Sequence, residues 1–450
     1  MAQKYKYLHF IDYILFQRWD VKAYAFQQKV FKNAVLLREI LTPYNVPLSK
    51  EKMIDKGWSI IAKINFAGEL FLRAPENTKT FKGNVHEIDG ETLIYSKINV
   101  RHGCVYYHPK DSIPFGVSSE YPAYKIDNKR VNGDFLVLLL QSQYFKNALS
   151  AGTSGISKAR VKPNVFLDIQ IPLPSLEEQK NIVSTYNAKI EQANIYSLCT
   201  YRINKKIEDY LHNILETNIE FDISGSFLNY VNYKDISRWD ALFLLSNNNI
   251  KSKYPLATLG QCISHFLTDQ NGKSLRRETY KTPEKEYTYI GMENVKKETG
   301  EIIDNVIVKG KDLKSQTIYV PSNYFLYGKL RPYLNKYWYN NIEKQQEEII
   351  CSSEFFVFDI KNNINSKYFL YVLASYIVQK QIIDAMSGAR MPRISEETFR
   401  GIQIPLPPLN IQNEIVEHID VLRKEQKDLQ QKALTLRQQA TQQFEQTIFN

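Results

Sequence analysis

The chain has 450 residues, of which 43% are hydrophobic and 24% are charged, and its formal net charge is +10. These values are typical of globular chains with two or three domains, so a single small module and wholesale disorder are both excluded. No run approaches the roughly 20 apolar residues that cross a bilayer, and residues 1–12 lack a secretory hydrophobic stretch. We therefore expect a cytoplasmic protein.

The positive charge is concentrated in two long segments. Residues 1–174 carry 24 Lys and Arg against 15 Asp and Glu, and residues 218–408 carry 24 against 21. Residues 175–217 and residues 409–450 each carry 5 against 6. A cationic surface of this kind favours a polyanionic partner such as nucleic acid, although it does not by itself establish one.

The hexapeptide IQIPLP occurs twice, at residues 169–174 and 402–407. Ordered matches surround both copies, which indicates a duplicated unit. Upstream they pair Arg18-Trp19-Asp20 with Arg238-Trp239-Asp240, Ser118-Ser119-Glu120 with Ser352-Ser353-Glu354, and Gly155, Arg160 and Val161 with Gly388, Arg393 and Ile394. Downstream they pair Leu176, Gln179, Ile182 and Val183 with Leu409, Gln412, Ile415 and Val416.

In chain order, each copy begins with a globular segment rich in Tyr, Phe, Val and Ile. Strands are expected at residues 92–100, 104–107, 287–291, 302–308 and 354–360, and helices at residues 135–148 and 367–386. The prolines of each IPLP sequence hold the chain extended, so a helix must begin after them. Ser175 with Glu178 forms a capping-box pattern at the first of these starts.

A long polar helix follows each IPLP sequence. Apolar residues recur at helical spacing after the first, and the second shows a heptad seam of Ile415, Ile419, Leu422, Gln426, Leu429, Ala433, Leu436 and Ala440. Helices of about 40 residues extend about 60 Å, so we expect the two to pack along each other. The alternatives are that each packs on its own domain or dimerises with another chain.

These patterns divide the chain into four segments. We expect a globular domain at residues 1–174, a central long helix at residues 175–217, a second globular domain at residues 218–408 and a C-terminal long helix at residues 409–450.

Recognisable catalytic motifs are missing from the sequence. There is no GxGxxG, GxxxxGK[ST], HExxH, GxSxG or acidic calcium loop. The triplets at residues 178–180 and 425–427 resemble half of a nuclease site, but we expect them on exposed helix faces. The four cysteines are scattered without CxxC pairing, and the cluster of His102, Cys104 and His108 lacks a fourth ligand, so neither a catalytic residue nor a metal site is predicted.

Cationic residues instead recur at equivalent places in the two copies. Two pairs follow corresponding strands and the others lie in corresponding loops, and such side chains suit both phosphate contacts and reading of guanine edges. Any one of them could be a solvated surface charge, but their duplication favours DNA binding. The predicted DNA-binding residues are Lys97, Arg101, Ser157, Lys158, Arg160, Lys329, Arg331, Arg390 and Arg393.

Taken together, the chain resembles the specificity subunit of type I restriction-modification systems over essentially its whole length. The resemblance is carried by IPLP followed by L-x-x-Q and I-V at each junction, by Gly-Lys-Leu-Arg-Pro at residues 328–332, by the Ser-Ser-Glu steps and by Pro392-Arg393-Ile394. The first copy departs from this pattern, with Ser96-Lys97-Ile98-Asn99 and Lys158-Ala159-Arg160 at the corresponding places.

The resemblance implies an α+β protein with two similar mixed α/β target-recognition domains and two long antiparallel helices that form a coiled coil. It implies a non-catalytic subunit that binds a bipartite, asymmetric site in double-stranded DNA, with the paired helices setting the spacing of the half-sites. Two methyltransferase subunits would methylate adenine, and motor-endonuclease subunits would restrict DNA. The chain itself would bind no cofactor, because AdoMet, ATP and Mg²⁺ would belong to these partners.

Two other classes of function remain open from the sequence. One is a coiled-coil scaffold that assembles other subunits without DNA. The other is a DNA nuclease with an unrecognised site.

Overall fold

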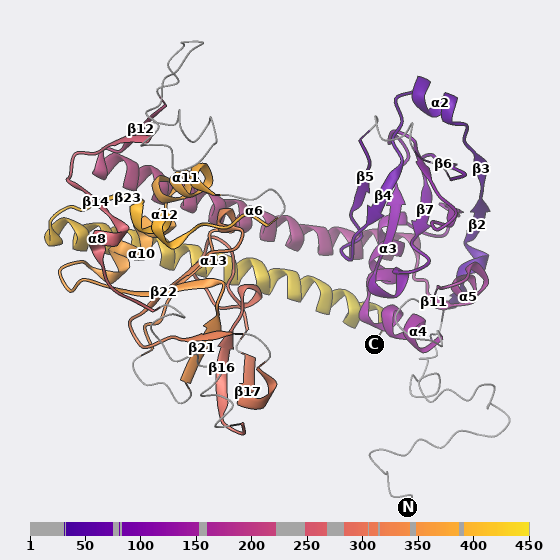
Figure 1. The fold of residues 1–450 in the computed structure, drawn as a ribbon. Coiled ribbons are helices and arrows are strands. Elements are labelled where there is room, and N and C mark those ends of the chain that lie inside the picture. Colours follow the sequence, from indigo (N-terminus) through magenta and orange to yellow (C-terminus); the bar gives the residue numbers. More distant parts are fainter. Residues whose placement is uncertain are drawn as a thin grey trace, which may run out of the picture. The chain divides into compact units, whose positions relative to one another are not determined.

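The computed structural model describes residues 31, 33–74, 81, 83–152, 160–221, 248–267, 283–304, 306–313, 316–342, 348–386 and 391–449. The chain forms two compact units, Met1–Ser197 with Gln430–Asn450 and Leu198–Leu429. Each unit contains one globular lobe together with part of each long helix, α6 (Leu176–Leu215) and α13 (Leu409–Phe449) (Figure 1).

The first lobe is built on an antiparallel four-stranded sheet. Its strand order is β2 (Leu41–Tyr44), β10 (Ala123–Ile126), β7 (Thr92–Tyr95), β8 (Val105–His108). Smaller sheets are formed by β3 (Val46–Pro47), β6 (His86–Ile88) and β9 (Phe115–Val117), and by β4 (Ile61–Ile64) and β5 (Leu70–Leu72). The helices are α2 (Lys50–Asp55), α3 (Gly133–Gln141), α4 (Gln143–Gly152) and α5 (Pro163–Leu167).

The second lobe repeats the four-stranded sheet in the same order. Its strands are β15 (Ile263–Leu267), β22 (Phe355–Ile360), β19 (Phe325–Gly328) and β20 (Tyr337–Tyr339). A further sheet runs β17 (Val306–Lys309), β16 (Glu286–Ile290), β21 (Glu348–Ser352), β18 (Thr317–Tyr319), with β16 and β21 parallel. The remaining elements are β12 (Asn218–Phe221), β13 (Asn248–Lys251), α8 (Leu259–Cys262), α10 (Ser366–Ala374), α11 (Tyr376–Ala385) and α12 (Glu396–Gly401).

The repeated IQIPLP sequence forms a strand in both lobes. In the first lobe β11 (Gln170–Pro172) pairs with β1 (Ala34–Leu36), and in the second β23 (Gln403–Pro405) pairs with β14 (Leu256–Thr258). The prediction that the prolines hold this segment extended before a helix is therefore confirmed. At the start of α6, Ser175 N–H donates to Glu178 Oε2 at 2.9 Å, and Glu178 N–H donates to Ser175 Oγ at 3.3 Å, which is the predicted capping box.

Each helix predicted inside a lobe is in fact two helices, which corrects the sequence-based expectation for residues 135–148 and 367–386. The first is interrupted at Ser142 and the second at Ser375, both in extended conformation. Their hydroxyl groups donate to Leu139 O at 2.6 Å and to Val372 O at 2.7 Å, so they satisfy carbonyls at the helix ends. The apolar spacing continues across each one-residue interruption and so could not reveal it.

Some predicted strands are shorter than expected. The strand predicted at residues 92–100 ends at Tyr95, and a 3-10 turn, η4 (Val100–His102), follows it. The strand predicted at residues 302–308 begins only at Val306. Val100 is buried within the 3-10 turn, whereas Ile302 forms only an isolated bridge to Val295 and Ile303 is exposed, so an apolar residue alone does not indicate a sheet ladder.

Both long helices contribute to the core of a lobe. In the first lobe Phe444 and Phe449 of α13 are buried with the domain's own residues, and the Phe449 ring stacks on Tyr144 with centroids 4.7 Å apart. In the second lobe Ile207 of α6 and Ile419 of α13 share one core. Completing each lobe therefore requires side chains from both copies of the repeat.

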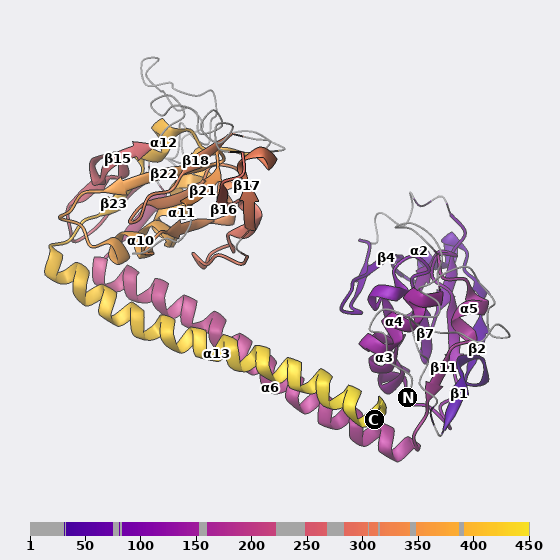
Figure 2. The ribbon, with the colours of Figure 1, turned by 90° about the horizontal axis from the view of Figure 1, so that it is seen from below.

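The two long helices also pack on each other and run antiparallel within each unit (Figure 2). In the first unit Lys189 Nζ donates to Gln443 Oε1 at 2.6 Å and Arg437 Nη2 donates to Asn194 Oδ1 at 2.8 Å. In the second unit the Tyr210 ring stacks on His418 at 4.0 Å. The predicted mutual packing is confirmed, and packing on the lobes occurs as well.

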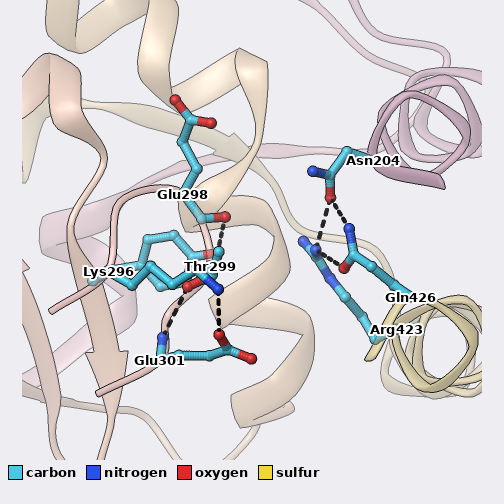
Figure 3. Close-up of polar contacts among 8 residues, drawn as sticks. Asn204, Lys296, Glu298, Thr299, Glu301, Arg423 and Gln426 are labelled. Atoms are coloured by element: carbon cyan, nitrogen blue, oxygen red, sulfur yellow. Dashed lines mark hydrogen bonds and ion pairs between the residues drawn. The ribbon is translucent and has the colours of Figure 1, made fainter. Parts of the chain in front are cut away.

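The polar residue of the heptad seam, Gln426, has polar partners across the helix pair (Figure 3). Its amide nitrogen donates to Asn204 Oδ1 at 2.7 Å, and Arg423 donates to Asn204 Oδ1 at 2.9 Å and to Gln426 Oε1 at 2.8 Å. Polar layers of this kind favour one register of a coiled coil over others.

Candidate nucleic-acid interface

Three segments of the second lobe meet where β19 ends, and backbone hydrogen bonds join them. Lys329 N–H donates to Glu354 O at 2.8 Å, and Ile394 N–H donates to Lys329 O at 3.2 Å. Arg331 N–H donates to Pro392 O at 2.7 Å. We call residues 329–331, 352–354 and 392–394 the second loop frame.

The first lobe repeats two of these three backbone bonds where β7 ends. Lys97 N–H donates to Glu120 O at 3.0 Å, and Val161 N–H donates to Lys97 O at 2.8 Å. Residues 97–99, 118–120 and 160–161 form the first loop frame. The duplicated sequence thus repeats these two backbone hydrogen bonds, although the backbone differs at Arg331 (φ 48°) and its counterpart Asn99 (φ −114°).

An arginine–glutamate pair lies in each loop frame. Arg160 Nε donates to Glu120 Oε2 at 3.1 Å. Arg393 makes two such bonds to Glu354, at 3.2 Å and 3.0 Å, and this carboxylate raises the pKa of the Arg393 guanidinium. The arginine side chains remain 61% and 50% exposed. Exposed ion pairs contribute little to stability, so the main effect of each glutamate is to orient its arginine.

A 3-10 turn follows the lysine of each loop frame. In the first lobe η4 begins three residues after Lys97, and in the second η8 (Pro332–Leu334) begins three residues after Lys329. Each turn ends at a residue in the left-handed region, Gly103 with φ 93° and Asn335 with φ 45°. Such positions favour Gly and Asn, which explains this pairing of residue types.

The two turns present different cations. Arg331 precedes η8, is exposed and has φ 48°, whereas Asn99 occupies the corresponding position before η4. Arg101 is the second residue of η4 and corresponds to Tyr333, which is 43% exposed. Arg101 and Arg331 therefore both follow corresponding strands, as predicted, but they are not structurally equivalent.

The lysines of the loop frames are less accessible than Arg331. Lys329 Nζ donates to Ser353 O at 2.8 Å and lies 5.1 Å from the centroid of the Phe356 ring. Lys97 is half-buried. Three predicted residues, Ser157, Lys158 and Arg390, lie outside the described residues. The structure thus brings Lys97 close to Arg160, and Lys329 and Arg331 close to Arg393.

The sequence-based reasoning did not assign roles to several residues that build the site. Glu120 and Glu354, which orient the arginines, were visible only as part of the repeated Ser-Ser-Glu steps. The repeated L-x-x-Q places a buried glutamine at each junction. The side-chain oxygen of Gln179 accepts from Asn132 N–H, and that of Gln412 accepts from Asn365 N–H, each at 2.8 Å. Both donors are helix N-cap residues. The amide nitrogens of the two glutamines donate to the carbonyls of Pro174 and Pro407, each at 2.8 Å. The triplet at residues 178–180 is therefore part of a structural junction.

The described residues include neither a metal-binding cluster nor a membrane-spanning helix. They contain no group of three or more His, Cys, Asp or Glu side chains that could hold a metal ion. Within the same ranges, no helix combines the length and the apolar character needed to cross a membrane.

Comparison with known proteins gives a family. Residues 71–195 and 262–436, together more than half of the chain, match the family model described as the type I restriction modification DNA specificity domain. A 53-residue stretch is 43% identical to the type I restriction enzyme MjaVIII specificity subunit of Methanocaldococcus jannaschii, and it spans 12% of this chain and 12% of that relative.

Two solved structures align with most of the chain. One, from work on complex assembly and conformational transition of the type I R-M system, is 15% identical with a TM-score of 0.53, covering 93% of this chain and 97% of that one. The S subunit of the type I restriction-modification system from M. genitalium is 16% identical with a TM-score of 0.43, covering 94% and 98%. The first likeness agrees with the two lobes and the antiparallel helices, and the fold class predicted from the sequence is confirmed. On the strength of the two matched segments, the chain belongs to the type I restriction-modification DNA specificity family.

Proposed function

We propose that this protein is the DNA sequence-recognition subunit of a type I restriction-modification complex in the cytoplasm. The observation that carries the proposal is the duplicated loop frame, which presents an oriented arginine in each of two similar lobes. The two loop frames share two backbone hydrogen bonds but differ in side chains, since Arg331 corresponds to Asn99 and Tyr333 to Arg101. Two related lobes with different DNA-contacting side chains suit a bipartite, asymmetric site in double-stranded DNA.

The residues proposed to contact DNA are those of the loop frames and their turns. Guanidinium groups bind phosphates and guanine edges through paired hydrogen bonds, and a glutamate that orients an arginine lowers the entropic cost of binding. The set comprises Lys97, Arg101, Arg160, Lys329, Arg331 and Arg393, together with Ser157, Lys158 and Arg390 from outside the described residues.

The proposal assigns no catalytic step to this chain. Two methyltransferase subunits would bring AdoMet and modify an adenine that is flipped out of the duplex. Motor-endonuclease subunits would bring ATP and Mg²⁺. In this proposal residues 1–174 and 218–408 are the target-recognition domains, and residues 175–217 and 409–450 are helices that set the half-site spacing.

Methylome sequencing of a host with and without the gene for this chain tests the proposal. The expected result is that one bipartite motif with a fixed spacer loses adenine methylation when the chain is absent. An unchanged methylome in a host that retains the methyltransferase would contradict the proposed function.

Gel shifts of the methyltransferase complex at several salt concentrations distinguish a DNA-recognition subunit from a scaffold without DNA affinity, because phosphate binding depends steeply on salt. Incubating the purified chain with DNA and divalent metal would reveal a nuclease.

A further inference from the structure

Each lobe is attached to both long helices, and the two attachments use different residue types. The helix that directly follows a lobe supplies a buried glutamine, Gln179 in the first unit and Gln412 in the second. The other long helix supplies a glutamate. Glu445 Oε1 of α13 accepts from Gln143 N–H at 2.6 Å, and Glu208 Oε2 of α6 accepts from Tyr376 N–H at 3.0 Å.

The two glutamates act at the same place in the two lobes. Gln143 and Tyr376 are the first residues of α4 and α11, directly after the serine interruptions described above. The first N–H groups of a helix have no partner within the helix, and a carboxylate is favoured near this end. The interruption at each serine therefore creates a helix N-terminus that a carboxylate of the long helices can cap.

The attachments are crossed between the copies of the repeat. Glu208 belongs to the helix that follows the first lobe but caps the second lobe, and Glu445 belongs to the helix that follows the second lobe but caps the first. Within its own unit, each lobe therefore has one such polar bond to each of two helices that pack side by side, in addition to the core that it shares with them. Apolar packing is non-directional, whereas a hydrogen bond on each of two helices opposes rotation of the lobe on the helix pair.

The surroundings of Glu208 support a positional role. The carboxylate packs near Arg423 of α13, and burial raises the pKa of Glu208 while Tyr376 N–H and Arg423 oppose that change. Arg423 in turn bonds to Asn204 and Gln426 (Figure 3). Because Arg423 also acts on Glu208, the cap of α11 adjoins the polar layer of the helix pair.

We propose that Glu208 and Glu445 are positioning residues that fix the angle of each lobe on the helix pair and thereby the spacing at which two half-sites are read. The claim about half-site spacing rests on the proposed function. The glutamates do not contact DNA in this proposal, so their loss should change the tolerated spacer and leave the half-site sequences intact.

Hydrogen exchange of the full chain, without any partner, tests the attachment itself. Glu445→Ala should speed exchange in peptides from the first turn of α4 roughly fivefold, the effect of losing a typical cap, and Glu208→Ala should do the same for α11. Glu445→Gln and Glu208→Gln keep an acceptor oxygen and should restore slow exchange. Glu417→Ala on α13 and Glu191→Ala on α6, both at exposed positions, are the matched controls. Unchanged exchange in both alanine variants would overturn the proposal.

Methylome sequencing with the assembled methyltransferase tests the consequence for spacing. The alanine variants should methylate sites with a spacer one base pair longer or shorter, at least tenfold more than the parent chain does, and the glutamine variants should not. Faster exchange with an unchanged spacer would show that the caps hold the helices but do not set the spacing, which overturns the inference. If the parent chain directs no bipartite methylation, the proposed function fails, while the exchange result still decides the attachment.

Discussion

Arg331 is the cation of the second loop frame that is best placed to meet DNA. Its backbone is held by the bond to Pro392 O and by the buried Pro332 that follows it, and its side chain is exposed. A positive φ at a non-glycine residue is uncommon and costs free energy that the surrounding contacts must offset. The left-handed turn thus directs one guanidinium outward from a rigid base.

We expect Arg331→Ala to weaken DNA binding by the assembled complex and to lower the salt dependence of log Kd by about one unit, as the loss of one phosphate contact predicts. Arg331→Lys should retain most of the salt dependence. Lys311→Ala, an exposed lysine paired with Glu284, is the control and should have little effect. Relaxed sequence preference with an unchanged salt slope would instead make Arg331 a reader of base edges.

Glu208 makes stability depend on pH in a predictable direction. Burial raises the pKa of Glu208 in the folded chain above the ordinary carboxyl value of about 4.3. The folded state therefore holds the proton to higher pH than the unfolded state does. This contribution to stability is fully present below the ordinary value and is lost as pH rises through the raised pKa.

Glu208→Gln keeps an acceptor for Tyr376 N–H but removes the titration. The variant should unfold at the same or a higher Tm than the parent at pH 7, and the difference should shrink as pH falls towards 4. Thermal unfolding over pH 4–7 checks this, with Glu191→Gln on the same helix as the control. A lower Tm at pH 7 would mean that the ionised carboxylate gains more from Arg423 than it loses on burial.

At the scale of elements, the junction glutamines join each lobe to its own long helix. Gln412 is 2% exposed and satisfies both Asn365 N–H and Pro407 O. Gln412→Leu leaves two buried backbone groups without partners, so it should lower the free energy of unfolding by about 1–3 kcal/mol. Urea titration measures this, and Gln438→Leu at an exposed position of the same helix should cost far less. Equal losses in the two variants would show that the junction bonds contribute nothing.

The sequence predicted the elements whose signals are local and repeated. Proline fixed the extended IPLP segment, apolar spacing indicated both long helices, and the identity of the two copies indicated matching lobes. The interruptions at Ser142 and Ser375 were missed because a serine within an apolar pattern looks like any exposed helical residue. The caps by Glu208 and Glu445 were missed because they join residues 168 and 302 positions apart, which no local pattern encodes.

In the candidate site, too, the sequence predicted some features and missed others. Duplication identified the lysines and arginines of the loop frames, since their neighbours repeat in sequence. It suggested that Arg101 and Arg331 play the same part, but the backbone places Arg101 at the position of Tyr333. Both 3-10 turns begin three residues after the lysine, so Arg331, two residues after Lys329, precedes its turn, whereas Arg101, four residues after Lys97, lies inside its turn.

At the scale of the whole molecule, the length of the helix pair should determine the spacer. Adding one heptad to both α6 and α13 lengthens each by about 10.5 Å, which corresponds to about three base-pair steps. We expect methylome sequencing to show a spacer longer by about three base pairs with unchanged half-sites. A heptad added to α6 alone would misalign the seam and should destabilise the chain. An unchanged spacer in the double insertion would refute this role of the helices.

The burial of Phe444 and Phe449 in the first lobe has a consequence for biosynthesis. The first lobe is synthesised well before the aromatic residues that complete its core, because Phe135 and Phe444 lie 309 positions apart in the chain. At about 5–20 residues per second that gap lasts roughly 15–60 s. During this interval the nascent lobe exposes an apolar surface, so its core can be completed only after α13 has been made.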